Sequence, residues 1–333
     1  MEPGLPAPRP EPGVAQSGVP QSGGSQSGVF PDGVVVREVW RSFGAVPALA
    51  GMSLTAPYGQ VTALVGPNGA GKTTLLLVLA SLLKPDRGQA WVAGSDPTKD
   101  AAGVRAQMGW MPDAFGVYDQ LTVREYLSFF GAAYRMDRAA VQSRTADLLR
   151  LVHLTEYADR PVHVLSRGQK QRLALTRALI HRPRVLLLDE PASGLDPRSR
   201  VELRDILRDL AAEGVAVLVS SHILTELEEI ADRVVLVAGG RTVGEFAMAD
   251  LREQAVRPYR VRALDRAPLV SALQDKGIEH STVNGAVELA QLTSAQAADA
   301  LAGLVTAGVR VVAFEPLGSD LESMYLAMTE ERR

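Results

Sequence analysis

Cysteine is absent from the 333 residues of this sequence. Its absence excludes disulfide bonds, thiolate zinc sites and cysteine nucleophiles, and leaves no argument for an oxidising compartment. The sequence also lacks the uninterrupted run of about 20 apolar residues that a membrane-spanning helix requires. The N-terminus shows no apolar stretch behind a basic region, so no secretory signal is expected. We therefore expect a cytosolic protein that reaches a membrane only through a partner.

A strong charge of either sign is lacking as well. The chain has 35 basic and 38 acidic residues, which gives a formal net charge of -3. Such a balance provides no overall basic field for holding the phosphates of a nucleic acid, although a local basic patch is compatible with it. We expect no nucleic-acid partner.

The composition divides the chain into a tail and two predicted domains, and a length of 333 residues is enough for two. Residues 1–30 contain six Pro, six Gly and four Ser. This segment cannot bury enough apolar surface to offset its ordering entropy, so a disordered tail is expected. The two domains are expected at 34–240 and 241–333.

The first of these regions predicts an α/β domain with a largely parallel core sheet. Short apolar runs alternate with helical patterns, and the runs are unbroken, as is typical of strands covered on both faces. The expected strands are Val61–Val65, Val185–Leu188 and Val215–Val219, and the expected helices are Lys72–Leu83, Arg167–His181, Arg198–Glu213 and Ile223–Ala231.

The second region predicts a small α+β domain. Its element order is βαββαβ, that of a ferredoxin-like unit, and an Asn-Gly pair at 284–285 indicates a hairpin between its second and third strands. We expect it to strengthen dimerisation, to gate access or to bind a regulator, and dimer support is the simplest of these. The remaining elements are strands at Tyr259–Leu264 and Val309–Phe314, and helices at Ala267–Lys276, Ser294–Thr306 and Asp320–Thr329.

A phosphate-binding loop is predicted by the segment GPNGAGKTT at 66–74. It has the spacing G-x-x-x-x-G-K-[ST] between an expected buried strand and an expected helix. Glycines let backbone N–H groups point at phosphate oxygens, and the helix start adds the positive end of its dipole. Lys72 can then reach the β- and γ-phosphates, and the Thr73 hydroxyl can bind Mg²⁺. The simpler alternative is a glycine-rich turn with a chance lysine.

Two further segments carry polar residues at strand ends. In VLLLDEP a buried strand delivers Asp189, which can bind the Mg²⁺ shell, and Glu190, a candidate general base. In VLVSSHILTEL another expected strand is followed by a helix, with His222 at the junction. The His222 side chain would then project from the same edge of the sheet. Taken alone, an acidic pair at a strand end or a histidine near a helix start is common. Together with the phosphate loop, we interpret Asp189 as a Mg²⁺ ligand and Glu190 and His222 as further residues of the same nucleotide site.

With LSRGQ at Leu165–Gln169, these motifs resemble those of the ATP-binding subunits of ABC transporters, over about 34–240. The resemblance identifies 66–74 as Walker A, Val185–Glu190 as Walker B and Ser193–Asp196 as the D-loop. It implies a P-loop NTPase cassette with an antiparallel β subdomain and a helical subdomain at about 114–180, using ATP and Mg²⁺. The ATP-binding residues so implied are Phe43, Pro67, Asn68, Gly69, Ala70, Gly71, Lys72, Thr73, Thr74, Ser166, Gly168, Gln169 and Asp196, with Glu190 and His222 as catalytic residues.

Two residues implied by the resemblance have competing interpretations. The aromatic that stacks on adenine in this family falls on Phe43, with Trp40 as a rival and core packing as the alternative for either. The family's metal-contacting glutamine falls on Asp113, so the predicted Mg²⁺ ligands are Thr73, Asp189 and Asp113. A carboxylate binds Mg²⁺ but has a shorter reach than glutamine. A turn residue after Pro112 is the alternative interpretation of Asp113.

The resemblance also explains why one chain has two phosphate-facing helix starts. In the family, two cassettes pair head to tail, and each signature helix faces the nucleotide held by the other Walker A. Ser166 can cap that helix and donate its hydroxyl, Gly168 permits close backbone approach, and the helix dipole favours the γ-phosphate. A chain with one copy of each half-site therefore needs a second chain, and a homodimer or paired cassette with ATP at its interface is expected.

The predicted function is that of an ATP-hydrolysing subunit that powers a separate polytopic membrane permease from the cytoplasmic face of the inner membrane. A single cassette followed by a small domain resembles the exporter-type branch that pairs with ABC-2 type permeases. A soluble ABC-type ATPase of translation or DNA repair is the alternative. Such proteins usually have two cassettes, a coiled-coil insertion or a basic tract, and none is seen here. A GTPase or kinase would not explain LSRGQ.

Overall fold

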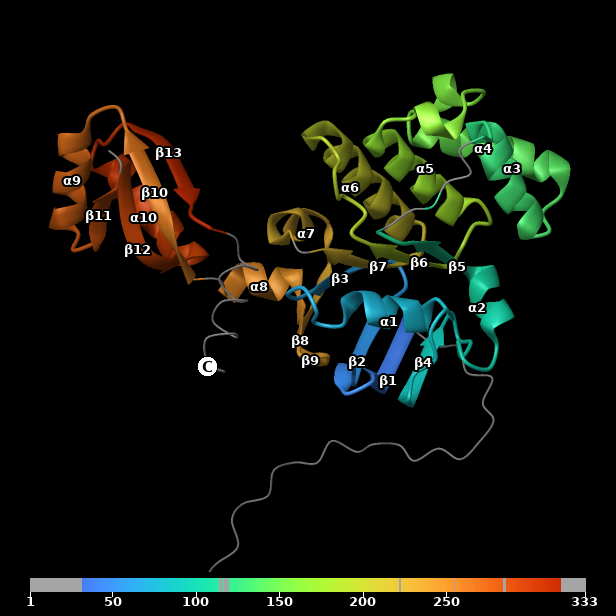
Figure 1. Ribbon diagram of the computed structural model, residues 1–333. Helices are drawn as coiled ribbons and strands as arrows, with labels where there is room; N and C mark the ends of the chain where they lie inside the picture. Colours follow the sequence, from blue (N-terminus) through green and yellow to red (C-terminus); the bar gives the residue numbers. More distant parts are fainter. Residues whose placement is uncertain are drawn as a thin grey trace, which may run out of the picture.

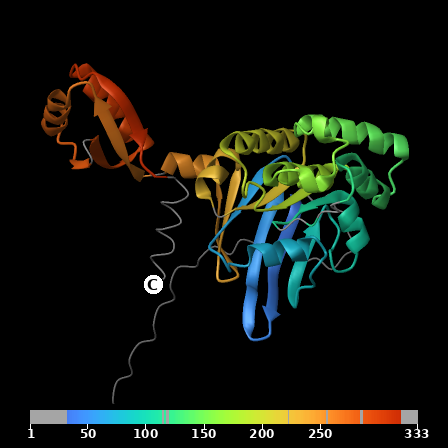
Figure 2. The ribbon, with the colours of Figure 1, turned by 45° about the horizontal axis from the view of Figure 1, so that its top comes forward.

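The computed structural model of this chain describes residues 32–318, apart from 114, 115, 117–119, 222, 255, 284 and 285. Two of its sheets belong to a first unit, and the third forms a second unit that follows α8, Met248–Gln254 (Figures 1 and 2). Among the described residues, no helix is both long enough and apolar enough to cross a bilayer. The expected N-terminal tail lies outside the described residues.

A six-stranded sheet in the order β5-β6-β7-β3-β8-β9 forms the centre of the first unit. Five strands are parallel to their neighbours, and only β9 runs antiparallel, beside β8. The predicted α/β class with a largely parallel core sheet is confirmed. The strands are β3 (Val61–Val65), β5 (Met108–Met111), β6 (Val185–Asp189), β7 (Ala216–Ser221), β8 (Arg233–Ala238) and β9 (Arg241–Ala247).

The unbroken apolar runs are explained by two cores, one on each face of this sheet. Successive residues of a strand point to opposite faces, so Ala63 joins the core beneath α5 and α6 whereas Leu64 joins the core beneath α1. Leu186 and Leu187 divide in the same way. Figure 1 shows α5 and α6 on one side of the sheet and α1 on the other. These helices are α1 (Lys72–Leu79), α5 (Arg167–Leu179) and α6 (Pro197–Ala212), and α7 (Leu224–Ile230) follows β7.

A smaller antiparallel sheet, ordered β2-β1-β4, covers the α1 side. It contains β1 (Asp32–Phe43), β2 (Val46–Pro57) and β4 (Arg87–Val92). Its inward side chains, including Leu49, Met52 and Leu54, are buried in the same core as α1. The β1–β2 hairpin is thereby held against the start of α1, where Ala48 and Leu49 of β2 lie beside Gly71.

A group of helices lies between β5 and β6. The first is α3, which begins with a capping box in which Thr122 and Glu125 bond each other's backbone N–H groups. Tyr126 and Leu127 of α3 and Leu148 of α4 are fully or almost fully buried. The group falls within the range 114–180 expected for a helical subdomain. Its helices are α3 (Val123–Ala133), α4 (Arg138–Leu151), the short 3-10 helices η1 (Thr155–Tyr157) and η2 (Val162–Val164), and α5, while α2 (Ala101–Gln107) precedes β5.

The second unit is a four-stranded antiparallel sheet in the order β11-β12-β10-β13 with a core of its own. This order confirms the predicted ferredoxin-like βαββαβ topology. The hairpin turn at 284–285 and the expected helix Asp320–Thr329 lie outside the described residues. The elements are β10 (Val256–Ala263), α9 (Arg266–Asp275), β11 (His280–Val283), β12 (Ala286–Thr293), α10 (Ser294–Thr306) and β13 (Val311–Pro316).

The first unit extends beyond residue 240, where the sequence pattern places the end of the first domain. Strand β9 pairs with β8 from Ala238↔Arg241 to Arg233↔Ala247. Met248 and Leu251 of α8 are then buried in the core that contains α5 and α6. The change of texture in the sequence near 240 therefore falls in a β8–β9 hairpin, and the separate core of the second unit begins with β10.

Candidate nucleotide-binding and hydrolysis site

The predicted phosphate loop connects β3 to α1 and is shaped by glycines. Gly69 and Gly71 have φ angles of +81° and +100°, a region that favours glycine. A Cβ at Gly66 would lie 2.2 Å from the Val237 carbonyl oxygen, and one at Gly71 would lie 2.5 Å from the Ala48 carbonyl oxygen. The loop is thus pressed between β8 and β2, and only glycine fits these two positions.

Lys72 opens α1 and turns its side chain back into this loop. Its Nζ donates hydrogen bonds to the carbonyl oxygens of Gly66, at 2.7 Å, and Pro67, at 3.3 Å. Burial lowers the pKa of Lys72, while the nearby carboxylates of Glu190 and Asp189 act in the opposite direction. The structure therefore brings together the cation of the loop and the acidic pair of β6.

The start of α1 is suited to an anion. No side chain caps it at Gly71, and its first turn has no acidic residue. The first N–H groups of a helix need acceptors, which phosphate oxygens provide. One side of the phosphate loop is fixed, because Ala70 is buried and hydrogen-bonded at both its N–H and its carbonyl. The other side is open to solvent. Its exposed residues are Pro67, Asn68, Gly69 and Thr73, and Thr74 is half-buried. The residues of this loop and helix start therefore fit a nucleoside triphosphate.

Asp189 and Glu190 are fixed at the carboxyl end of β6 by Ser220 of β7. The strands pair Asp189 with Ser220, whose Oγ donates to Asp189 Oδ1 at 2.5 Å. The Glu190 N–H donates to the Ser220 carbonyl at 3.1 Å. Glu190 itself has φ +50°, a left-handed conformation that costs a non-glycine residue about 1 to 3 kcal/mol. The chain therefore turns sharply after Asp189, while that carboxylate stays buried beside the loop.

The predicted metal ligands share one edge of the sheet. Met111 of β5 pairs with Leu188 of β6, so Asp113, two residues beyond β5, leaves the sheet at the same edge as Asp189. Asp113 is exposed and Asp189 is 2% exposed. Mg²⁺ typically takes one or two protein oxygens and completes its octahedron with water and phosphate. Asp189 and the Thr73 hydroxyl fit that donor set.

His222 lies outside the described residues. The strand before it ends at Ser221, which pairs with Val65 at the end of β3. The chain therefore reaches position 222 from the strand that neighbours the one carrying the phosphate loop.

Both candidate aromatic residues lie on β1 and contact a guanidinium group. Phe43 ends the strand and is 51% exposed, with Arg41 Cζ 5.1 Å from its ring centroid. Trp40 is 36% exposed, and Arg241 Cζ lies 5.5 Å from its ring. A Cβ on Gly51 would lie 3.1 Å from the Trp40 ring, so Trp40 packs on the backbone of β2. Phe43 presents the more open face.

The signature segment forms the start of α5, as expected. Ser166 is the N-cap: its Oγ accepts from the Gln169 N–H at 3.3 Å, and Gln169 Oε1 accepts from the Ser166 N–H at 2.8 Å. In the described chain both residues hydrogen-bond each other rather than the phosphate loop. Asp196 caps α6 through Ser199, whose hydrogen bonds lower the pKa of Asp196. The structure thus brings Lys72 near the acidic pair, whereas the hydrogen bonds that Ser166 and Gln169 make with each other do not reach the phosphate loop.

Three contributors to the site were missed in the sequence: Ser220, Gln171 and Arg172. Gln171 Nε2 donates to the Pro191 carbonyl at 3.0 Å, directly after the acidic pair. Arg172 Nη2 donates to Ser199 Oγ at 2.5 Å. The one signal in the sequence was the serine pair 220–221, which directly follows the apolar run 216–219 of β7. The contacts depend on register and helix packing, which the sequence does not display.

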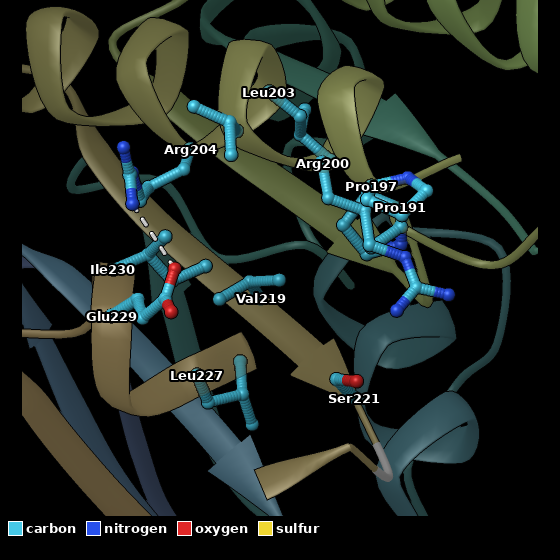
Figure 3. A pocket seen from close by; sticks show the side chains of 12 residues that line it. Pro191, Pro197, Arg200, Leu203, Arg204, Val219, Ser221, Leu227, Glu229 and Ile230 are labelled. Carbon is cyan, nitrogen blue, oxygen red and sulfur yellow. Dashed lines mark hydrogen bonds and ion pairs between the residues drawn. The ribbon is translucent and has the colours of Figure 1, made fainter. Parts of the chain in front are cut away.

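A groove of about 310 Å³ lies between α6 and α7 next to this site (Figure 3). Pro191, Val219 and Ile230 form apolar parts of its lining, and Ser221 lies at one end. Arg204 Nη1 and Glu229 Oε2 form an ion pair of 3.1 Å across it. The groove is distinct from the phosphate loop, whose residues do not line it.

Comparison with known proteins agrees with this geometry. The family model "ABC transporter" matches residues 49–193. The ABC transporter ATP-binding protein NatA of Bacillus subtilis (strain 168) is 37% identical over 209 residues, which cover 62% of this chain and 85% of NatA. Nod factor export ATP-binding protein I of Burkholderia lata is 38% identical over 220 residues, covering 66% of this chain and 72% of that protein. This chain spans 33% of a longer relative, a probable multidrug ABC transporter ATP-binding protein of Escherichia coli (strain K12).

Among solved structures, an ATP-binding subunit of an ABC transporter superposes with a TM-score of 0.62 at 28% identity, covering 66% of this chain and 92% of that one. The fold and the site define a P-loop ATPase of the cassette type. The chain belongs to the family of ABC transporter ATP-binding subunits, whose members hydrolyse ATP. It is therefore associated with transport, and the alternative of a soluble, non-transport ATPase is not supported.

Proposed function

We propose that this chain binds Mg-ATP at the loop of residues 66–74 and hydrolyses it in a head-to-tail dimer that drives a separate membrane permease. One observation carries the proposal: Lys72, inside the loop, lies within electrostatic reach of both Asp189 and Glu190. Smaller, uncharged residues could fill the same space, so packing does not explain a buried cation and two carboxylates beside a glycine-rich loop. They suit a triphosphate and its metal.

The geometry of the described residues supports the following roles, and the role of His222 rests on the family resemblance alone. Lys72, now bonded to the loop carbonyls, would turn to the phosphates, which are stronger acceptors. Thr73 and Asp189 would hold Mg²⁺, with Asp113 as a further ligand directly or through water. The metal would neutralise charge on the phosphates. Glu190, released from the buried strand by its left-handed backbone, would orient and deprotonate the attacking water, and His222 would contact the γ-phosphate.

Base recognition would fall to Phe43. Its exposed ring lies at the end of the hairpin whose partner strand β2 contacts the phosphate loop at Gly71. Trp40 is less suited because its ring already packs on Gly51. Stacking on adenine would use the open face of the Phe43 ring, while Arg41 occupies the other side.

The second half of each site would come from another chain. Ser166, Gly168 and Gln169 present the capped start of α5, yet none bonds the loop of its own chain. The residue before Asp196, Leu195, contacts this helix start, since a Cβ at Gly168 would lie 3.6 Å from Leu195 Cδ2. In a two-fold arrangement, each signature would close over the nucleotide held by its partner, so that ATP joins the two chains and hydrolysis separates them.

The family supports a proposal for the partner and the location. We propose a polytopic permease bound through the helical group α3–α5, which would hold this chain at the cytoplasmic face of the inner membrane. Export is the proposed direction, because a relative of this chain is a Nod factor export protein. The ferredoxin-like unit, which has its own core, would be a separate domain that supports the dimer.

Glu190→Gln tests the proposed hydrolysis. General-base catalysis contributes about 10²- to 10⁴-fold, so turnover should fall by that range while ATP still binds. ATP binding is followed by equilibrium dialysis and turnover by phosphate release, with Glu213→Gln, an exposed residue at the C-terminal end of α6, as the control. Near-normal hydrolysis by Glu190→Gln would remove Glu190 from the role. Co-purification in mild detergent then tests the partner, since a polytopic membrane subunit should be recovered rather than ribosomes or DNA.

A further inference from the structure

Arg167, the third residue of the signature segment, lies along the D-loop of its own chain. Its Nη2 donates to Ser193 Oγ at 3.2 Å. A Cβ at Gly194 would come within 2.4 Å of Arg167 Nε and 2.8 Å of its Cζ, so the guanidinium packs directly on that glycine. Gly194 also has φ +73°, which favours glycine. The loop therefore has both the shape and the hydroxyl that seat this side chain.

Two other residues of α5 hold the same loop at its ends. Gln171 bonds the Pro191 carbonyl, and Arg172 bonds Ser199 in the first turn of α6. Positions 167 and 171 are spaced i, i+4 on one face of the helix, and position 172 lies at the side of that face. Between the two ends, Arg167 supplies the side-chain contact at the middle of the loop.

We propose that Arg167 is a positioning residue that fixes Ser193–Asp196 to the start of α5, so that the signature and the D-loop move as one body. The inference rests on the proposed function and deepens it. Ser166 would meet the nucleotide of the partner chain, whereas the Ser193 N–H is bonded to the carbonyl of Glu190, at 3.1 Å. Arg167 thereby couples the half-site offered to the partner with the general base of its own chain.

The coupling predicts that Arg167 and Ser193 act as one unit. A hydrogen bond of this kind corresponds to about a three- to tenfold effect. Arg167→Met and Ser193→Ala should each lower kcat by that factor with the KM for ATP unchanged, and the double variant should lose no more than either single one. Arg167→Lys should recover part of the loss, since it keeps one donor but not the planar group that packs on Gly194.

Hydrogen exchange provides a readout that does not depend on turnover. In the nucleotide-free full chain, amides of residues 192–196 should exchange faster in Arg167→Met and in Ser193→Ala than in the wild type. Arg198→Met is the matched control: it removes a nearby exposed guanidinium that pairs with Glu202 at 3.0 Å and should leave those amides unchanged.

The outcomes separate this inference from the proposed function. Multiplying losses in the double variant, or a raised KM for ATP, would show that Arg167 acts elsewhere, for example on the nucleotide of the partner, and would overturn the proposal. Unchanged exchange at 192–196 would overturn it as well. If the wild-type chain failed to hydrolyse ATP, the proposed function would fail, while the exchange experiment would still decide whether Arg167 holds the loop.

Discussion

Replacing Ser220 by alanine should destabilise the first unit more than replacing its neighbour Ser221. Ser220 is fully buried and donates to the buried Asp189 carboxylate, and its Oγ also accepts from the Glu190 N–H at 3.3 Å. Ser221 is 4% exposed and its Oγ accepts one bond, from the Ile223 N–H at 3.0 Å. The two variants therefore delete the same atom at similar burial but break different hydrogen bonds.

The size of each loss of stability depends on which hydrogen bonds the missing hydroxyl made. A hydrogen bond to a charged group contributes about 1.5 to 3 kcal/mol, and one between neutral groups about 0.5 to 1.5 kcal/mol. We expect Ser220→Ala to lower the free energy of unfolding by about 2 to 3 kcal/mol and Ser221→Ala by about 1 kcal/mol. Ser220→Ala should also raise the Mg²⁺ concentration needed for half-maximal ATPase activity, because Asp189 loses the bond that orients it.

The assay is urea unfolding followed by tryptophan fluorescence. The three tryptophans, Trp40, Trp91 and Trp110, all lie in the first unit, so the signal reports on that unit alone. Equal losses of stability in Ser220→Ala and Ser221→Ala, together with an unchanged Mg²⁺ requirement, would refute the role given to Ser220.

The remaining predictions concern the phosphate loop and a half-buried histidine, His181. Gly71→Ala should abolish ATP binding and lower stability, because its Cβ would lie 2.5 Å from the Ala48 carbonyl oxygen at a position with φ +100°. Gly69→Ala has open space around it and should cost only the backbone strain of about 1 to 3 kcal/mol. Dialysis and urea unfolding compare the two variants. Burial lowers the pKa of His181, which stacks on Tyr134, from 6.5 to about 4. Since the unfolded chain then binds the proton more readily, stability should be complete above pH 6.5 and fall by up to about 3 kcal/mol toward pH 4. His181→Gln should flatten that part of the curve, and an unaltered slope would contradict the assignment.

Much of the core could be predicted because apolar runs and helix-capping residues can both be recognised in a short stretch of sequence. The apolar run Val61–Val65 coincides with β3, since every residue of a strand between two cores must be apolar. Helix α10 coincides with the expected Ser294–Thr306 because Thr293 and Gln296 form a capping box that marks its start. Helix α1 is shorter than the expected Lys72–Leu83: Ser81 adopts φ +59° and ends it, although leucines continue beyond.

The candidate site, too, could be predicted only in part. Lys72, Asp189 and Glu190 stand at fixed distances from strand ends, so spacing predicts that they meet. The contacts of Arg167 with Ser193 and of Ser220 with Asp189 join residues 26 and 31 positions apart, and depend on how α5 packs and how β6 and β7 are registered. The periodicity of the sequence indicates neither the packing of α5 nor the register of β6 and β7. The same limit explains the domain boundary, because the pairing of β9 with β8 extends the first unit past 240.

The central claim is that two chains enclose ATP between the loop of one and the signature of the other. The most direct test is light scattering of the Glu190→Gln chain, of 35.6 kDa, with saturating Mg-ATP. The account predicts a doubling of mass on adding Mg-ATP, and its loss when Lys72→Ala or Ser166→Arg is introduced. A mass that stays at that of one chain would contradict it.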